Sequence, residues 1–410
     1  MPSHYCRKDS KRLYFPEEFR NVSNLYRIYK DNCRQSEIKA MSFQVFRTWF
    51  KKSYNIGFHV PKKDKCAICV NTKNNEEKSG EETEKIQQHA NEKDESYKRF
   101  KCHQNIHKKD KSIICASFDM QKVLNTPHGD SMMLYFSRKL SVYNFTIYES
   151  STRRGYCNVW TEIDANRGAN EICTCLYNYI KKIDSCGLTR TLLLYCDSCY
   201  GQNKNKFVLS TIRYALSQCK NIKTIQINYL IPGHTYMPVD SVHATIETKI
   251  RKCIIWAPSQ WPTIMELARL DPEPYKVEVL NGKDFTGFDD LVNSTFNKKQ
   301  KLPISKLSIA TFKNQEPNLM YIKNSMLPDA ETITIPLSPL KNTNCLKDML
   351  YPTALEISAK KYKDLTSLVN KNIIPSRFAA EYKNLKVSIK AKDYLMDTDE
   401  EDIQEIDSAN

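Results

Sequence analysis

The amino-acid sequence predicts a mixed α/β (α+β) protein whose central part, residues 111–255, has the order βββαβαβα and a five-stranded mixed sheet. Three observations predict this fold. β-rich runs separated by turn residues fill 111–163, two helical patterns flank one short apolar strand, and a further strand and helix follow. Hydrophobic residues make up 40 % of the 410 residues and only 10 are glycine, which indicates a folded chain.

The first half of this part contains three expected strands and a helix. The strands are KSIICASFDMQKVL (111–124), SVYNFTIYES (141–150) and YCNVWTEI (156–163), all rich in β-branched and aromatic residues. The helix is NEICTCLYNYIKKI (170–183), because one face would carry Ile172, Leu176, Tyr179, Ile180 and Ile183.

The second half alternates strands and helices. TLLLYCD (191–197) is a continuous apolar run, typical of a strand buried on both faces. A helical pattern over 207–219, the strand IKTIQINYLI (222–231) and the helix DSVHATIETKIRKC (240–253) follow. In a sheet of this order the first and fourth strands are expected to be neighbours.

The flanking regions differ from this part. Residues 1–110 form a basic, helical N-terminal region with a candidate zinc knuckle, in which aromatic and basic residues alternate; such a stripe suits either a core or DNA. A strand-rich extension (256–345), a small helical module (346–392) and an acidic, disordered tail (393–410) are expected to follow.

The chain is strongly basic, with a formal net charge of +15. Residues 397–407 hold seven acids and no base, so the remainder carries +15 plus 7, or about +22. This excess favours DNA as the partner, although lysine-rich surfaces also serve solubility. The sequence has neither a membrane span nor a signal peptide, which predicts a nuclear protein with reduced cysteines. The sequence is also compatible with a homo-oligomer.

Two aspartates stand where expected strands end, Asp119 in CASFDMQ and Asp197 in LLLYCDSCYGQN. A carboxylate at the end of a buried strand is costly unless a cation meets it. Because these two strands are expected to be neighbours, the carboxylates would lie together. Clustered acids with oxygen ligands suit Mg²⁺ or Mn²⁺, and two such ions would serve phosphodiester cleavage.

The stretch DSVHATIE places Asp240, His243 and Glu247 along one side of the last expected helix. Val239, Val242, Ile246, Ile250 and Cys253 form the apolar face, which would pack on the sheet. The alternative reading is that Asp240 is the N-cap of the helix and Glu247 a surface charge.

Taken together, this element order and these acids resemble the ribonuclease H-like catalytic domain of DDE/D transposases and integrases. DSCYGQNKNKF and PGHTYMPVDSVHATIE resemble, more narrowly, a family of transposon-derived animal proteins, and PKKDKCAIC and YKDL…IIPSRFAAEYKNL extend the match. The resemblance implies a transposase-derived enzyme for Mg²⁺-dependent DNA cleavage and strand transfer. The alternative is a domesticated, inactive DNA-binding or chromatin protein that keeps the fold.

The resemblance also implies roles for individual residues. Asp119 would be the first metal ligand and Asp197 the second, while either Asp240 or Glu247 would be the third. His243 would be a ligand, a general acid or a residue that orients a ligand. Other candidates have two possible roles each. His234, in the PGHT loop, would contact the scissile phosphate or structure the loop. Gln202 and Asn203 would orient the substrate or, preferably, cap the following helix.

A C-x₂-C pair, Cys66 and Cys69, is a candidate structural Zn²⁺ site. His89 follows after nineteen intervening residues and is the preferred third ligand. The alternative is a pair of unliganded thiols near a turn. For the fourth position four residues compete: Cys102, His103, His59 and Cys33.

Overall fold

The structure of the protein is a computed structural model. The described residues are 13–15, 19, 22–54, 56–57, 66, 68–69, 72, 80–296, 302–339, 346, 349–389 and 391. They fall into two compact units, Met1–Val70 and Asn71–Asn410. His59 and the acidic tail lie outside the described residues. None of the described helices is long and apolar enough to cross a membrane.

The N-terminal unit is a helix pair with a small aromatic core. Helix α1 (Val22–Gln35) and helix α2 (Phe43–Ser53) make this region helical, as expected, and β1 (Leu13–Tyr14) pairs in parallel with β2 (Ile56–Gly57). Phe46 and Phe50 are buried, and the ring of Phe46 stacks on that of Tyr29 with centroids 4.9 Å apart. The aromatic stripe of this region is therefore mainly a core.

The second unit is built on one large mixed sheet. Ten described strands belong to it, in the order β12-β11-β10-β8-β7-β3-β5-β6-β9, and β4 pairs with β5. Strand β3 is parallel to β7, and β7 to β8, whereas β5 is antiparallel to both β3 and β6. The strands are β3 (Ile113–Met120), β4 (Leu124–Thr126), β5 (Leu140–Glu149), β6 (Gly155–Thr161), β7 (Thr191–Cys196), β8 (Thr224–Tyr229), β9 (Lys276–Val279), β10 (Ile309–Lys313), β11 (Leu319–Lys323) and β12 (Ile333–Pro336).

The sheet is larger than the sequence predicts. The first and fourth predicted strands, β3 and β7, are neighbours as expected, but the expected number of five strands is wrong. Strand β10 pairs with β8 along its whole length, β11 and β12 follow, and β9 pairs with β6 on the other side. The strand-rich extension thus continues the central sheet.

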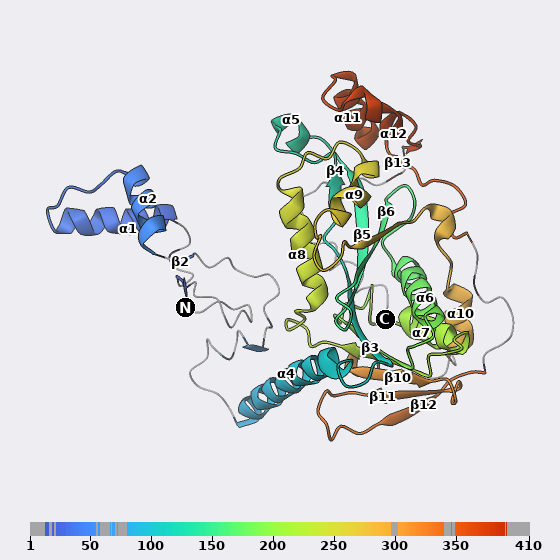
Figure 1. Ribbon diagram of the computed structural model, residues 1–410. Helices are drawn as coiled ribbons and strands as arrows, with labels where there is room; N and C mark the ends of the chain where they lie inside the picture. The colour runs from blue at the N-terminus through green and yellow to red at the C-terminus, as the bar shows by residue number, and fades with distance from the viewer. Residues whose placement is uncertain are drawn as a thin grey trace. The chain divides into compact units, whose positions relative to one another are not determined.

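Helices cover both faces of this sheet (Figure 1). Helix α6 (Ala169–Ser185) and helix α7 (Lys206–Ser217) pack on one face with α10 (Asp289–Thr295). Helix α8 (Pro238–Ile250), helix α9 (Trp261–Glu266) and the C-terminal part of α4 (Gly80–Ile106) pack on the other. Although α4 is highly charged, its Phe100 is buried and stacks on Tyr195 of β7 with centroids 4.1 Å apart.

Strand alternation decides which face the strand-end acids point to. On β3, Ala116 and Phe118 pack against α6 and α7, whereas Cys115 packs on the opposite face. The carboxylate of Asp119 is in phase with Cys115. On β7, Tyr195 lies on that same opposite face, and Asp197 is two residues further on. Both carboxylates therefore point to the face that carries α8.

The C-terminal module packs around a small apolar core of its own. It contains helix α11 (Ala359–Asn370), helix α12 (Ala379–Lys383) and the parallel pair β13 (Ile357–Ser358) and β14 (Val387–Ser388). Leu134, from the short helix α5 (Met132–Tyr135), joins this core. An ion pair also ties the module to the sheet: Lys361 Nζ donates to both oxygens of Glu162 at 2.7 and 2.8 Å.

Lys361→Met is expected to lower the free energy of unfolding by about 3 kcal/mol, because it leaves the Glu162 carboxylate largely buried without its cation. Lys360 is exposed on the same helix and provides the matched control, Lys360→Met, with a change of no more than about 0.5 kcal/mol. Urea unfolding of the three proteins measures both changes. Equal stabilities would show that the ion pair does not hold the module.

Candidate functional site

Three metal-ligating groups from two elements meet at the end of β3. One ligand atom each of Asp119, Asp240 and His243 lies within 4.8 Å of the others. Strand β3 supplies Asp119, while α8 supplies Asp240 and His243 from one side of a single turn. We call these three residues, with the neighbouring Asp197, the acidic cluster.

Asp197 joins the cluster through the register of the sheet. Ser117 pairs with Tyr195 in the parallel β3–β7 ladder, so two residues further on Asp119 comes level with Asp197. Asp197 Oδ1 accepts a hydrogen bond from Asn203 Nδ2 at 2.6 Å and another from the backbone N–H of Cys199 at 3.2 Å. The fully buried Asn203 thereby fixes the carboxylate of Asp197.

The expected capping role of Asn203 is wrong. Helix α7 begins at Lys206, and its N-cap is Asn205, whose side chain accepts from the N–H of Val208. Gln202 and Asn203 lie in the turn before it. Since Asn203 precedes the helix by three residues, its amide can reach back to Asp197.

Asp240 is at the third position of α8, and Met237 is the N-cap, so the N-cap reading of Asp240 is also wrong. Its Oδ2 accepts from the backbone N–H of Met237 at 2.7 Å, which anchors the carboxylate in the first turn of the helix. Val239, Val242, Ile246 and Ile250 are buried, as the helical pattern predicts. They fix the rotation of the helix that turns Asp240 and His243 toward β3.

His243 contributes a buried nitrogen without a hydrogen-bond partner. The residue is 8 % exposed, and its Nε2 atom has no partner among the described residues. Burial lowers the pKa of His243 to about 4, so the imidazole is neutral at pH 7. A neutral, buried ring nitrogen beside two carboxylates is the donor set expected of a metal ligand.

Two buried amides that the sequence reading missed hold this turn of α8. Gln121 Nε2 donates to the backbone carbonyl of His243 at 3.4 Å, and Asn144 Nδ2 donates to Gln121 Oε1 at 2.9 Å. Both residues are almost fully buried. In the sequence nothing distinguishes them from other polar residues in or beside strands, and only the packing of α8 on β3 and β5 gives them a positioning role.

The carboxylates of the cluster repel one another. Burial raises the pKa of Asp119 well above its usual value, and the charges of Asp197 and Asp240 raise it further. Burial also raises the pKa of Asp240 to about 6, against the lowering effect of its bond to Met237. The site therefore favours a bound cation or protons over three bare charges.

One arginine lies near this negative charge. Arg167, in the loop between β6 and α6, partly offsets the rise in the pKa of Asp119, and its buried Nε atom has no partner among the described residues. A guanidinium in this position is suited to a phosphate oxygen held beside the acids. No sequence pattern marks Arg167, because it stands in an irregular loop.

The other residues predicted for catalysis or zinc binding lie elsewhere. Glu247 is on α8 but outside the group formed by Asp119, Asp240 and His243. Cys66 and Cys69 lie in the N-terminal unit, with their sulfur atoms within 4.8 Å of each other. His89 is on α4 and lies beside His234. The competitors for the fourth zinc position are placed as follows: Cys33 is buried on α1, Cys102 is exposed on α4, and His103 accepts or donates a 2.8 Å hydrogen bond with Tyr195.

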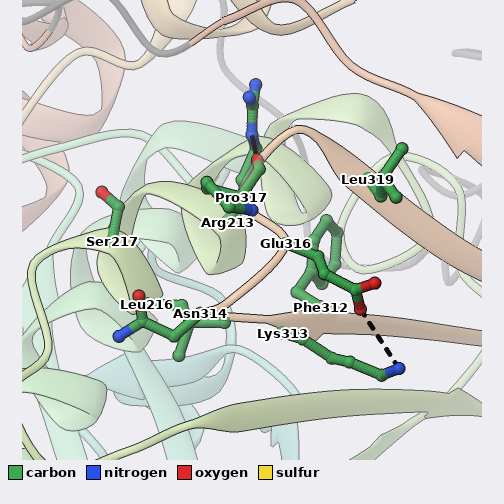
Figure 2. A pocket seen from close by; sticks show the side chains of 9 residues that line it. All are labelled: Arg213, Leu216, Ser217, Phe312, Lys313, Asn314, Glu316, Pro317 and Leu319. Atoms are coloured by element: carbon green, nitrogen blue, oxygen red, sulfur yellow. Dashed lines mark hydrogen bonds and ion pairs between the residues drawn. The ribbon is translucent and has the colours of Figure 1, made fainter.

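A shallow pocket lies away from the cluster, between the end of α7 and the β10–β11 turn (Figure 2). Most of its polar groups are used within the protein. Arg213 Nε donates to the carbonyl of Pro317 at 2.8 Å, and Lys313 pairs with Glu316 at 3.2 Å. These bonds brace the β10–β11 turn against α7, so the pocket offers little to a ligand.

Comparisons with known proteins give one family. Its sequence profile, described as a domain of unknown function (DUF7869), matches residues 149–321, which is less than half of the chain. The match includes Asp197 and the whole of α8 but begins after Asp119. No curated protein matches the chain.

One solved structure is similar at a low level, the crystal structure of the central domain of yeast acetyl-CoA carboxylase. Its sequence identity is 11 % and its TM-score is 0.13, over 65 % of this chain and 36 % of that chain. This chain thus spans little more than a third of the length of that protein, and the likeness carries no argument about fold or function.

Proposed function

We propose that residues 111–255 are a ribonuclease H-like catalytic domain that cleaves DNA phosphodiesters and transfers the strands, as the resemblance to DDE/D transposases implies. The observation that carries the proposal is the meeting of Asp119, Asp240 and the unpartnered His243 nitrogen within 4.8 Å, with Asp197 alongside. Asp119 is separated from Asp240 and His243 by more than 120 positions in the chain.

The arrangement of the sheet adds support. Strands β8, β7, β3, β5 and β6 lie in this order, with β5 antiparallel to its neighbours and the other central pairs parallel. In chain order these are the fifth, fourth, first, second and third strands of the predicted part, an arrangement typical of ribonuclease H-like domains. Asp119 lies near the end of the first strand, Asp197 follows the fourth, and Asp240 is in the first turn of the last helix.

The residues of the cluster fit a divalent ion such as Mg²⁺ or Mn²⁺. Asp119, Asp197 and Asp240 would supply hard oxygen ligands, and His243 would ligate or orient from α8. When bound, such ions activate the attacking hydroxyl and stabilise the leaving oxygen. Asn203 and Met237 hold two of the carboxylates in place, and Arg167 would contact a phosphate oxygen of the substrate.

The partner proposed is DNA, and the location proposed is the nucleus. The excess of basic residues favours a polyanionic partner, and the proposed reaction, cleavage and strand transfer at DNA phosphodiesters, requires DNA as substrate. A domesticated protein that keeps this fold without cleavage remains the alternative, and the presence of all the candidate acids favours activity over it.

Nicking of a supercoiled plasmid tests the proposal. With Mg²⁺ or Mn²⁺, the parent protein is expected to nick the plasmid, and Asp197→Asn is expected to lose on the order of a thousandfold in rate, because it removes a metal ligand. The exposed Asp290 provides the matched control, Asp290→Asn, which should cleave like the parent.

Equal nicking by the parent and Asp197→Asn would refute the acidic cluster as the active centre. A parent that binds DNA but leaves it intact under all metal conditions would favour the domesticated, inactive alternative.

A further inference from the structure

Two histidines from distant parts of the chain meet beside the loop that leads into α8. His89 is on α4, and His234 is in the loop between β8 and α8, 145 positions later. Their Nε2 atoms are 3.2 Å apart, and their ring planes are inclined by 48°. Both side chains are half-buried.

A tight turn presents His234. The N–H of His234 donates to the carbonyl of Ile231 at 2.9 Å, and Gly233 has a φ of +75°. Pro232 followed by a glycine with positive φ is the pattern of a type II turn. The chain thus fixes the position of this histidine through its backbone, as a metal ligand requires.

The distance between the two nitrogens matches a shared zinc ion. Nitrogens bound to one tetrahedral Zn²⁺ at about 2.0–2.1 Å lie roughly 3.3–3.4 Å apart. Burial lowers the pKa of both histidines, and Lys93 acts in the same direction. A direct hydrogen bond between two imidazoles is the competing explanation, and it needs no metal.

We propose that His89 and His234 are two ligands of a structural Zn²⁺ ion, and that the thiolates of the C-x₂-C motif, Cys66 and Cys69, are the other two. The motif is the thiolate pair that the sequence predicts for zinc, and neither cysteine forms a disulfide. The fourth ligand is then His234, for which the sequence suggests phosphate contact or a role in loop structure.

The proposed ion would stabilise the start of α8 and leave the chemistry to the acidic cluster. His234 precedes Asp240 by six residues, and the N-cap of the helix, Met237, lies between them. Fixing the loop at His234 would therefore restrict the segment that delivers Asp240. This inference is independent of the proposed DNA cleavage, since a structural zinc is equally useful to an inactive protein.

The test is the zinc content of the full-length chain purified without added metal. We expect about one zinc per chain in the parent. His234→Gln and the double variant Cys66→Ser with Cys69→Ser should each lose zinc affinity by more than the roughly 10- to 100-fold typical of changing a residue that only orients a ligand. Cys102→Ser, at an exposed cysteine on α4, is the matched control and should keep its zinc.

Replacement of the metal by Co²⁺ in the parent needs no variant and so is not affected by misfolding. We expect the intense visible bands of tetrahedral Co²⁺ and a near-ultraviolet charge-transfer band from thiolate ligands. A parent without zinc, or His234→Gln with full zinc affinity, would overturn the proposal. Tetrahedral Co²⁺ without the thiolate band would overturn the assignment of the two cysteines.

Discussion

Asp119→Asn is expected to abolish DNA cleavage and at the same time to stabilise the metal-free protein. Without a cation, burial disfavours the charged form of Asp119, and the negative charges of Asp197 and Asp240 disfavour it further. A neutral amide of the same shape removes this cost. We expect a gain of roughly 1 kcal/mol, or about 2 °C in melting temperature, in EDTA. Cleavage should fall on the order of a thousandfold.

Asp184 is the matched control, because it is a buried aspartate with the opposite electrostatics. Its carboxylate accepts from the backbone N–H groups of Lys220, Asn221 and Ile222, and although burial acts to raise its pKa, these three bonds lower it overall. Asp184→Asn should therefore destabilise the protein and leave the acidic cluster intact. If both variants lose stability in EDTA, repulsion among the acids of the cluster does not destabilise the metal-free protein.

The raised pKa of Asp240 makes the stability of the metal-free protein depend on pH. Because the pKa of Asp240 rises from 3.8 to about 6 on folding, the native state binds more protons than the unfolded state within this window. The stability of the metal-free protein should thus fall as the pH increases from about 4 through 6. Mg²⁺ or Mn²⁺ should offset the loss, with a larger rise in melting temperature at pH 7 than at pH 5. Asp240→Asn should flatten both trends.

The second large effect separates the two candidates for the third acid. Asp240→Asn is expected to lose cleavage on the order of a thousandfold, because Asp240 belongs to the group with Asp119 and His243. Glu247→Gln, on the same helix but outside that group, should stay within about threefold of the parent. Both substitutions preserve size, so a difference in rate reports the carboxylate.

Single-turnover plasmid cleavage with a saturating concentration of Mn²⁺ makes this comparison, with circular dichroism to verify folding. A loss in Glu247→Gln that equals the loss in Asp240→Asn would place both acids in the reaction. Full activity of Asp240→Asn would remove α8 from the proposed metal site.

Much of the central fold follows from local patterns in the sequence. The apolar periodicity of 170–183 and the continuous run TLLLYCD predict α6 and β7, and the structure confirms both. The adjacency of β3 and β7 follows from the order of elements, and it brings the end of β3, with Asp119, beside the end of β7, before Asp197.

The sequence could not give the parts that depend on distant contacts. The strands β10 to β12 pair beyond β8 through a connection of about 80 residues, and short strands of this kind carry no signal for their partners. The roles of Asn203 and Gln121 likewise arise from hydrogen bonds to groups on other elements. Polar residues in loops and at strand ends look alike until these partners are known.

The pairing of β10 with β8 also limits how the protein can be divided. A fragment that ends at residue 255, where the sequence pattern suggests a boundary, would lack β10 and expose the N–H and C=O groups of β8 as a bare edge. Such edges recruit other chains and lead to insoluble material. A minimal fragment for biochemical work must therefore extend through β12 to about residue 339, so that β8 keeps β10 as its partner strand.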